Sequence, residues 1–157
     1  MKLVISRHTA LAVIALAIGV FALSQPAAAA GDCTKSKGNL LVVNNGNGTT
    51  SGTILQGGKL NGITQVVFTS AFIPTPDANT ISYTDDFTVT TNKGVLKTHN
   101  VGVFDVALGL FSEIARIDPN ASTDAFAGAT GVLYINGTTA DSGATFQAAI
   151  TGEICAN

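Results

Sequence analysis

The sequence predicts an all-β protein: an antiparallel up-and-down barrel of about eight strands, preceded by an N-terminal signal helix. Runs rich in β-branched and aromatic residues alternate with clusters of Gly, Asn, Asp and Pro, and no convincing helical segment follows residue 30. The turns between successive strands are short, which implies antiparallel neighbours, and closure into a barrel removes exposed strand edges. A β-sandwich is the alternative architecture.

The first thirty residues have the features of a secretory signal peptide. Lys2 and Arg7 precede an apolar run over residues 10–23, and small residues follow that are typical of a cleavage site between Ala30 and Gly31. The apolar run is shorter than the roughly 20 residues needed to span a bilayer, so a membrane anchor is the weaker interpretation. We therefore expect a secreted or periplasmic protein with no membrane span after cleavage.

Cleavage would leave residues 31–157, which are enough for one domain. Six Lys and Arg against ten Asp and Glu give this part a formal charge of −4, and the absence of a basic cluster argues against nucleic-acid binding. Its two cysteines, Cys33 and Cys155, lie at its two ends. In an oxidising compartment we expect them to form a disulfide.

In the first half of the mature chain, an irregular lead-in over 31–38 precedes four expected strands. The strand 39–43 ends in Asn-Asn-Gly-Asn-Gly, and the strand 50–56 ends at two glycines. The long strand 62–73 is closed by prolines, and the alternating strand 80–91 ends in an Asn-Lys-Gly hairpin turn.

Four more strands complete the barrel. The strand 95–104 follows the hairpin turn, and the strand 108–118 ends at a proline. The strands 125–136 and 144–155 are separated by the polar loop 137–143. The strands 62–73 and 108–118 are apolar on both faces, which suggests a second covered surface such as an oligomer interface.

Asp85 is the most informative polar residue of the chain. It shares one face of its strand with Ile81, Tyr83, Phe87 and Val89, and that apolar face must be buried. A carboxyl group in an apolar lumen has a raised pKa and is a candidate acid or base. A local bulge that turns Asp85 outward, or a place at a barrel end, is the structural alternative.

Glu113 and Arg116 are further weak candidates for a catalytic role. They lie on opposite faces of one strand, so one of the two is expected to point inward, where an unpaired charge is costly. An inward Arg116 would form a structural ion pair with Asp85. Tyr83, Phe87 and Tyr134 are candidate ligand-binding residues together with Asp85, although strand aromatics more often serve packing.

No metal or cofactor site is expected. His99 is the one histidine of the mature chain and has no second histidine or cysteine nearby to complete a zinc site. No serine lies in a nucleophile-elbow context, so Ser-His-Asp catalysis is not predicted.

The C-terminal half resembles the allene oxide cyclase and dirigent β-barrel superfamily. The segments that carry the resemblance are Val-Gly-Val-Phe-Asp at 101–105, Gly-Leu-Phe-Ser-Glu-Ile-Ala-Arg-Ile-Asp at 109–118, Phe-Ala-Gly-Ala-Thr-Gly at 126–131 and Ile-Thr-Gly-Glu-Ile-Cys at 150–155. Relatives commonly carry a glycine-rich turn where this chain has Asp-Pro-Asn-Ala-Ser-Thr-Asp at 118–124. The resemblance implies a barrel with a hydrophobic cavity, and no catalytic residue is carried over from it.

Three functional hypotheses follow. The first is an exported, non-enzymatic barrel that binds a small apolar ligand in its lumen. The second is a cyclase or isomerase on the same scaffold, with Asp85 and one of Glu113 or Arg116 lining the cavity. The third is a surface structural protein that oligomerises through its two-sided apolar strands. An open lumen lined by polar groups would favour the second hypothesis, and a lumen filled by side chains would remove the first two.

Overall fold

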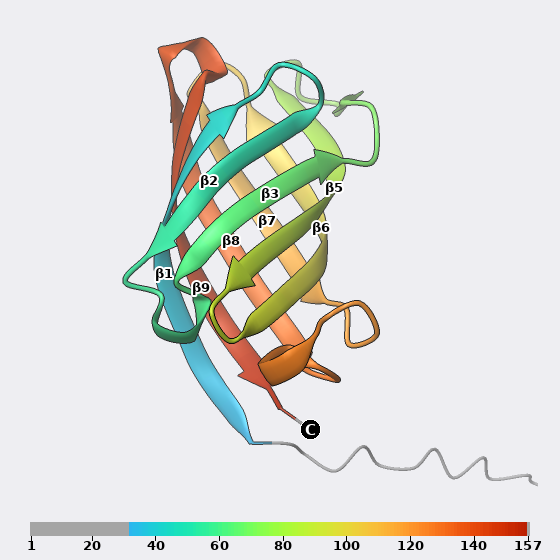
Figure 1. Ribbon diagram of the computed structural model, residues 1–157. Helices are drawn as coiled ribbons and strands as arrows, with labels where there is room; N and C mark the ends of the chain where they lie inside the picture. The colour runs from blue at the N-terminus through green and yellow to red at the C-terminus, as the bar shows by residue number, and fades with distance from the viewer. Residues whose placement is uncertain (1–31, 157) are drawn as a thin grey trace, which may run out of the picture.

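The computed structural model describes residues 32–156, which form a closed barrel of eight antiparallel strands and one short extra strand (Figure 1). The extra strand, β4 (Ile73–Pro74), pairs with β5 beside the closed circuit. The barrel strands are β1 (Cys33–Asn44), β2 (Thr49–Leu55), β3 (Gly62–Phe68), β5 (Thr80–Thr91), β6 (Gly94–Asp105), β7 (Leu110–Ile117), β8 (Thr130–Ala140) and β9 (Thr145–Cys155).

The barrel has up-and-down topology. Each strand of the circuit pairs with the next one along the chain, and the pairing of β1 with β9 completes the circle. The predicted barrel is confirmed, and the β-sandwich alternative is wrong because the strands of residues 32–156 form a single closed sheet. The predicted signal peptide lies outside the described residues. Between residues 32 and 156, no helix is long and apolar enough to cross a membrane.

The first strand is longer than its sequence suggests. β1 begins at Cys33, so the prediction of an irregular lead-in over 31–38 is wrong. Residues 33–38 pair with residues 150–155 of β9, and this partner strand compensates for their weak strand propensity. Cys33 lies directly opposite Cys155, and the predicted disulfide between them is confirmed.

Two further strands differ from the prediction. Residues 125–126 belong to a 3-10 turn, and β8 runs over Thr130–Ala140 because Gly137 does not break it. A Cβ atom at position 137 would lie 2.2 Å from the carbonyl oxygen of Gln147, so glycine is what allows β8 and β9 to stay paired there. The predicted strand 62–73 is interrupted after Phe68 and resumes briefly as β4.

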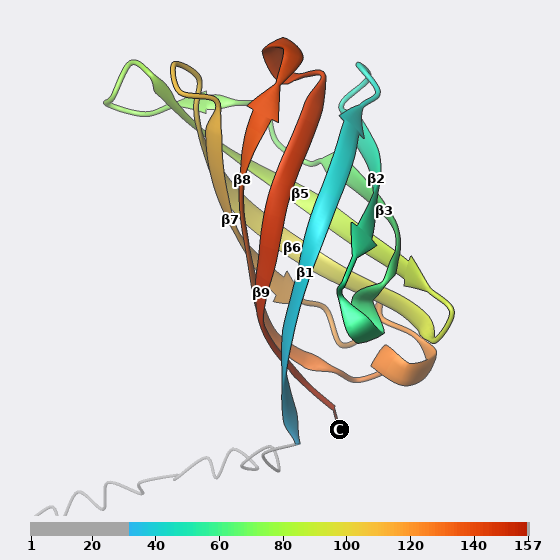
Figure 2. The same ribbon diagram turned by 90° about the vertical axis from the view of Figure 1, so that its left-hand side faces the viewer.

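The two ends of the barrel differ. Two 3-10 turns, η1 (Gly58–Leu60) and η2 (Asp124–Phe126), lie at the end drawn lowest in Figure 1, where Leu60 and Phe126 are buried in the core. The opposite end carries the connections β1–β2, β3–β5, β6–β7 and β8–β9. Figure 2 shows the β3–β5 connection extending outward from this second rim. We call this second end the mouth.

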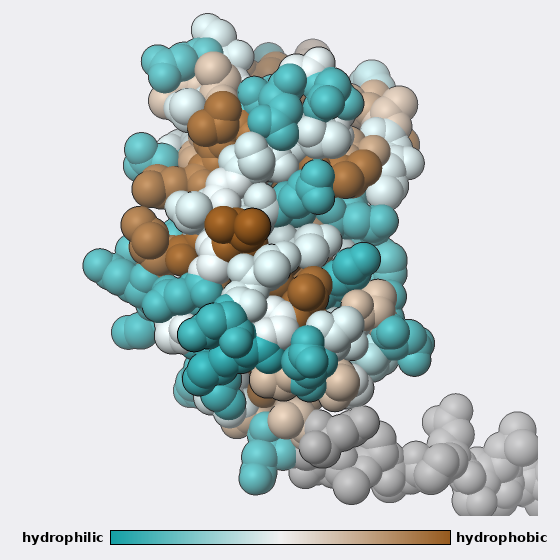
Figure 3. Space-filling view, in the orientation of Figure 1, coloured by the Kyte–Doolittle hydropathy of each residue, from teal (hydrophilic) through white to brown (hydrophobic). Residues whose placement is uncertain are grey.

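The outer surface carries apolar side chains scattered among polar ones (Figure 3). On β3, Ile63 and Val67 are exposed, and on β7 Leu110 and Ile114 are exposed. The inward faces of the same strands carry the buried Val66 on β3 and the buried Ala115 and Ile117 on β7, so apolar side chains lie on both faces of each strand.

Candidate functional site

A cavity of about 240 Å³ occupies the mouth end of the lumen. Asn44, Phe72 and Ser142 line it and are exposed, so the cavity opens to solvent at the mouth. Toward the other end, buried residues such as Leu96 and Leu133 belong to the packed core that reaches Leu60 and Phe126. The barrel is therefore hollow near its mouth and solid near η1 and η2.

Aromatic rings form much of the cavity wall. Phe68, Phe72 and Tyr83 pack edge to face around one another, with ring centroids 5.3–5.8 Å apart. Phe111 of β7 and Phe146 of β9 form a second edge-to-face pair, with centroids 5.8 Å apart. All five rings line the cavity. Each such aromatic pair stabilises the folded state by about 0.5–1.5 kcal/mol beyond the contribution of its buried area. The aromatic wall therefore contributes to the stability of the fold.

A hydrogen bond crosses the wall between two strands that are not neighbours. The Tyr83 hydroxyl of β5 donates to Oε1 of Glu113 on β7 over 2.8 Å, and β6 runs between them. The register places Gly102 of β6 directly between the two residues. A Cβ atom at position 102 would lie 2.4 Å from Cζ of Tyr83, so the tyrosine ring lies where only a glycine leaves room.

Glu113 accepts a second hydrogen bond from the adjacent strand. Asn100 donates from Nδ2 to Oε2 of Glu113 over 3.2 Å, and the Thr98 hydroxyl donates to Oδ1 of Asn100 over 2.6 Å. Thr98, Asn100 and Glu113 are all buried. Each carboxylate oxygen of Glu113 therefore has one donor, and the donors fix its orientation toward the cavity.

Asp85 lies one inward position beyond Tyr83 and opposite Asn100. Its exposed fraction is 1%, and among residues 32–156 neither of its oxygens has a hydrogen-bond partner. Burial raises the pKa of Asp85 to about 8, with a further rise from the charges of Glu113 and Asp86 and a small offset from the Asn100 amide. Asp85 therefore holds its proton at neutral pH.

The other two titratable groups of the interior are perturbed in the same direction. Burial raises the pKa of Glu113, although the hydrogen bonds from Tyr83 and Asn100 oppose that rise. Burial and the neighbouring Glu113 raise the pKa of the Tyr83 hydroxyl. The site thus combines two buried carboxyl groups that influence one another with one phenol, and it can hold or exchange a proton beside the cavity.

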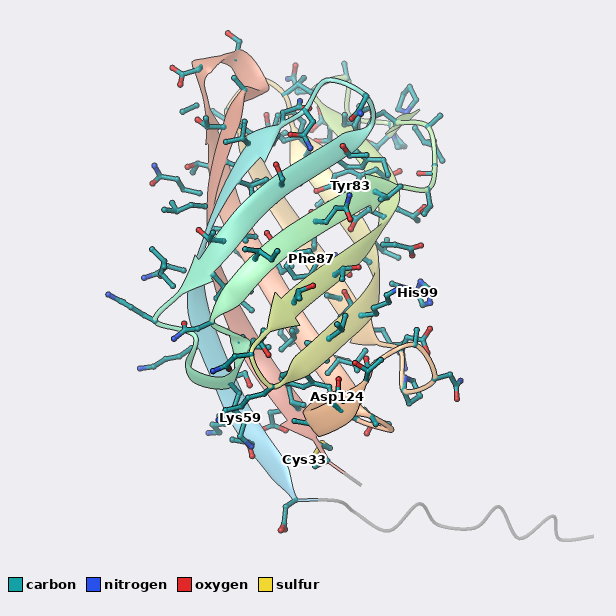
Figure 4. All side chains as sticks on the ribbon, in the orientation of Figure 1. Cys33, Lys59, Tyr83, Phe87, His99 and Asp124 are labelled. Atoms are coloured by element: carbon teal, nitrogen blue, oxygen red, sulfur yellow. A yellow bond between two sulfur atoms is a disulfide. The ribbon has the colours of Figure 1, made fainter. Side chains whose placement is uncertain are left out.

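Three of the sequence-predicted site residues line the cavity: Tyr83, Phe87 and Glu113. Figure 4 shows Tyr83 and Phe87 along the same strand. Asp85 faces inward as expected, with no bulge to turn it outward, and is not among the residues that line the cavity. Their ligand-binding and catalytic roles stay predictions.

Two predicted site residues lie outside the lumen. Arg116 is exposed, so the proposed ion pair between an inward Arg116 and Asp85 is wrong. It is Glu113 that faces inward, because it shares its face with the buried Ala115 and Ile117. Tyr134 has an exposed fraction of 48% on the outer surface and cannot offer its hydroxyl to a ligand in the cavity.

Several residues of the site are not predicted by the sequence. Asn100 and Gly102 lie on the inward face of β6, whose outward face carries Lys97 and His99. Those two polar residues were the available signal that the face with Asn100 is the inner one. The aromatic wall was missed because its rings come from separate strands and meet only across the lumen.

His99 lies outside, as Figure 4 shows, between two carboxylates. Its Nδ1 is 2.6 Å from Oδ1 of Asp86, and its Nε2 is 3.2 Å from Oδ2 of Asp118. Hydrogen bonding to Asp86 raises the pKa of His99, and backbone hydrogen bonds from Asn120 and Ala121 lower that of Asp118. Across the described chain, no three His, Cys, Asp or Glu side chains gather as a metal ion would require.

Comparison of the chain with family models, with curated proteins and with solved structures gives no match.

Proposed function

We propose that this protein is an exported binding protein that holds one small, largely apolar molecule in the lumen at the mouth of the barrel. The observation that carries the proposal is the cavity itself, which is open at one end and walled mainly by aromatic and aliphatic side chains. A dry apolar cavity of about 150 Å³ is enough to hold benzene, so the 240 Å³ present here suits a one- or two-ring skeleton.

The same cavity indicates a polar group on the ligand. The Thr50 hydroxyl is a buried lining group without a hydrogen-bond partner among the described residues, and Glu113 lines the cavity as well. A buried polar atom left unpaired costs about 1–3 kcal/mol, so a ligand that pairs with it gains affinity. Export is part of the proposal, and the Cys33–Cys155 disulfide supports it because such bonds persist in oxidising compartments.

A pair of matched variants tests the proposal. Val66 lines the cavity from β3, while its neighbour Val67 points outward with an exposed fraction of 43%. Naphthalene titrated by calorimetry is expected to bind the wild-type protein and V67F alike in a one-to-one complex. V66F fills the cavity and is expected to lose at least about tenfold in affinity. Circular dichroism checks that both variants fold, and equal naphthalene binding by folded V66F, or none by wild type, would refute the proposal.

A cyclase or isomerase is the second candidate function. This second proposal includes a relationship to the allene oxide cyclase and dirigent barrels. The observation that favours it is the pair of buried carboxyl groups, Asp85 and Glu113, beside the cavity. The test is to extract the molecule carried by protein from its own host and incubate it with wild type and D85N. Conversion to an isomer by wild type alone, detected by chromatography, would support catalysis.

A further inference from the structure

Within residues 32–156, the interior of the barrel carries acidic side chains and no basic one. The titratable side chains that face inward are Tyr83 and Asp85 of β5 and Glu113 of β7, and the inward positions of the other six strands carry none. All six cationic side chains of residues 32–156 are exposed: Lys35, Lys37, Lys59, Lys93, Lys97 and Arg116. The two buried carboxyl groups therefore have no counter-ion within the described fold.

Outside the lumen, acidic side chains lie at both ends of the barrel, but the cationic ones lie toward one end. Asp77, Asp105 and Asp141 lie in or beside the connections at the mouth. All six cationic side chains lie toward the other end, from Lys35 and Lys37 near the start of β1 to Arg116 near the end of β7. Asp77 and Asp105 also accept hydrogen bonds from turn backbone groups, which hold these side chains in place. A negative rim without cations attracts a cationic ligand and repels an anionic one.

We propose that the molecule held in the lumen is an organic cation, an apolar ring skeleton with an amine or ammonium group that pairs with Glu113. This inference rests on the proposed lumen-binding function and names the chemical class of its ligand. Glu113 lines the cavity and uses two of the roughly four acceptor positions of a carboxylate for Tyr83 and Asn100. The remaining positions are available to a ligand that donates.

The aromatic wall suits the same ligand class. Tyr83 lines the cavity, donates a hydrogen bond to Glu113 and packs against Phe68 and Phe72. The carboxyl group of Glu113 therefore lies close to this aromatic cluster. A cation within about 6 Å of a ring centroid gains about 0.5–2 kcal/mol from the ring, more when it is desolvated. An amine at this position would therefore meet both a carboxylate and ring faces.

A bound cation also changes the ionisation of the two carboxyl groups. The pKa of Asp85 is raised to about 8, mainly by burial and then by Glu113, and burial raises the pKa of Glu113 as well. A positive charge beside them favours their ionised forms, so cation binding is expected to release protons below that pKa. By linkage, affinity for a permanently charged cation then rises with pH, by up to tenfold per pH unit for each proton released.

The test compares four probes that share one skeleton: 2-naphthylmethylamine, 2-naphthalenemethanol, 2-naphthoate and (2-naphthylmethyl)trimethylammonium. Calorimetry at pH 7 is expected to show the amine binding wild type at least about tenfold more tightly than the alcohol, and the carboxylate most weakly. In E113Q the ratio of amine to alcohol affinity is expected to fall to about one. The matched control E153Q removes an exposed acid near the opposite end and is expected to keep the wild-type ratio.

A second measurement needs no variant. Affinity of wild type for the trimethylammonium probe is expected to rise from pH 6 to pH 9, while that for the alcohol does not rise. Alcohol binding that equals or exceeds amine binding, or a trimethylammonium affinity that does not change with pH, would overturn the cation inference and leave lumen binding intact. Absence of binding by all four probes would instead contradict the proposed function.

Discussion

At the scale of single residues, the interior contains two carboxyl groups that differ in how many hydrogen bonds they receive. Glu113 receives one hydrogen bond at each oxygen, from Tyr83 and Asn100. Asp85 is buried one inward position further along β5 and receives none from the described residues. An unpaired buried carboxylate is costly, and protonation is the cheapest way to remove its charge. The barrel therefore tolerates Asp85 mainly in its neutral form.

This ionisation makes the stability of the barrel depend on pH. The pKa of Asp85 is about 8 in the native state and about 3.9 in an unfolded chain, so between these values the native state binds the extra proton. The contribution of Asp85 to the free energy of unfolding is then highest below pH 4. It falls as the pH rises toward 8, by roughly 1.4 kcal/mol per pH unit at most. We expect D85N to flatten this slope in urea unfolding measured from pH 5 to pH 8.5.

The exposed Asp141 provides the control for that measurement, because D141N removes a carboxyl group from the mouth without touching the interior. D141N is expected to keep the wild-type slope. A D85N protein whose stability changes with pH as steeply as that of wild type would show that Asp85 is not the group responsible.

The sequence predicts part of this site and not the rest, for a physical reason. The alternation of β5 is enough to place Asp85 and Tyr83 inside, because the opposite face is almost wholly polar. Glu113 and Arg116 could be assigned to opposite faces but not to the inner and outer ones, since both faces of β7 carry apolar residues. The Tyr83–Glu113 bond depends on the register of three strands, which no single strand encodes.

At the scale of elements, the hairpins were predictable and the exceptions involve long-range partners. The bounds of β5 agree with the prediction because clear turn signals flank an alternating run. The start of β1 was missed because residues 33–38 form a strand through their pairing with β9. The motif at 126–131 was assigned to a strand, but its Phe126 belongs to η2 and closes the end opposite the mouth.

Phe126 has an exposed fraction of 2% and packs in the core beside that end. We expect F126A to lower the free energy of unfolding by about 3–5 kcal/mol, because the truncation leaves a cavity that the strands cannot collapse to fill. Urea denaturation measures the change. The control L108A truncates an apolar residue with an exposed fraction of 69% at the mouth and is expected to change stability by about 0.5 kcal/mol or less. Equal losses in the two variants would contradict the assignment of Phe126 to the packed end.

At the scale of the whole molecule, the barrel separates stability from binding along its axis. The packed core, the turns η1 and η2 and the disulfide lie toward one end, and the cavity and its aromatic wall lie toward the other. Which part of the lumen is hollow follows from how all eight strands fill it together, so the sequence could predict a barrel but not where it is open. The six cationic side chains also lie toward the packed end.

If the mouth end of the lumen holds a ligand, magnetic resonance can locate that ligand within the barrel. Nuclear Overhauser contacts between bound 2-naphthylmethylamine and methyl groups of the protein report position without reliance on a variant. A ligand bound in the lumen is expected to give contacts to Val42, Val66 and Ile135, which line the cavity. Contacts confined to outward methyl groups such as those of Ile63, Val101 and Ile114 would contradict binding in the lumen.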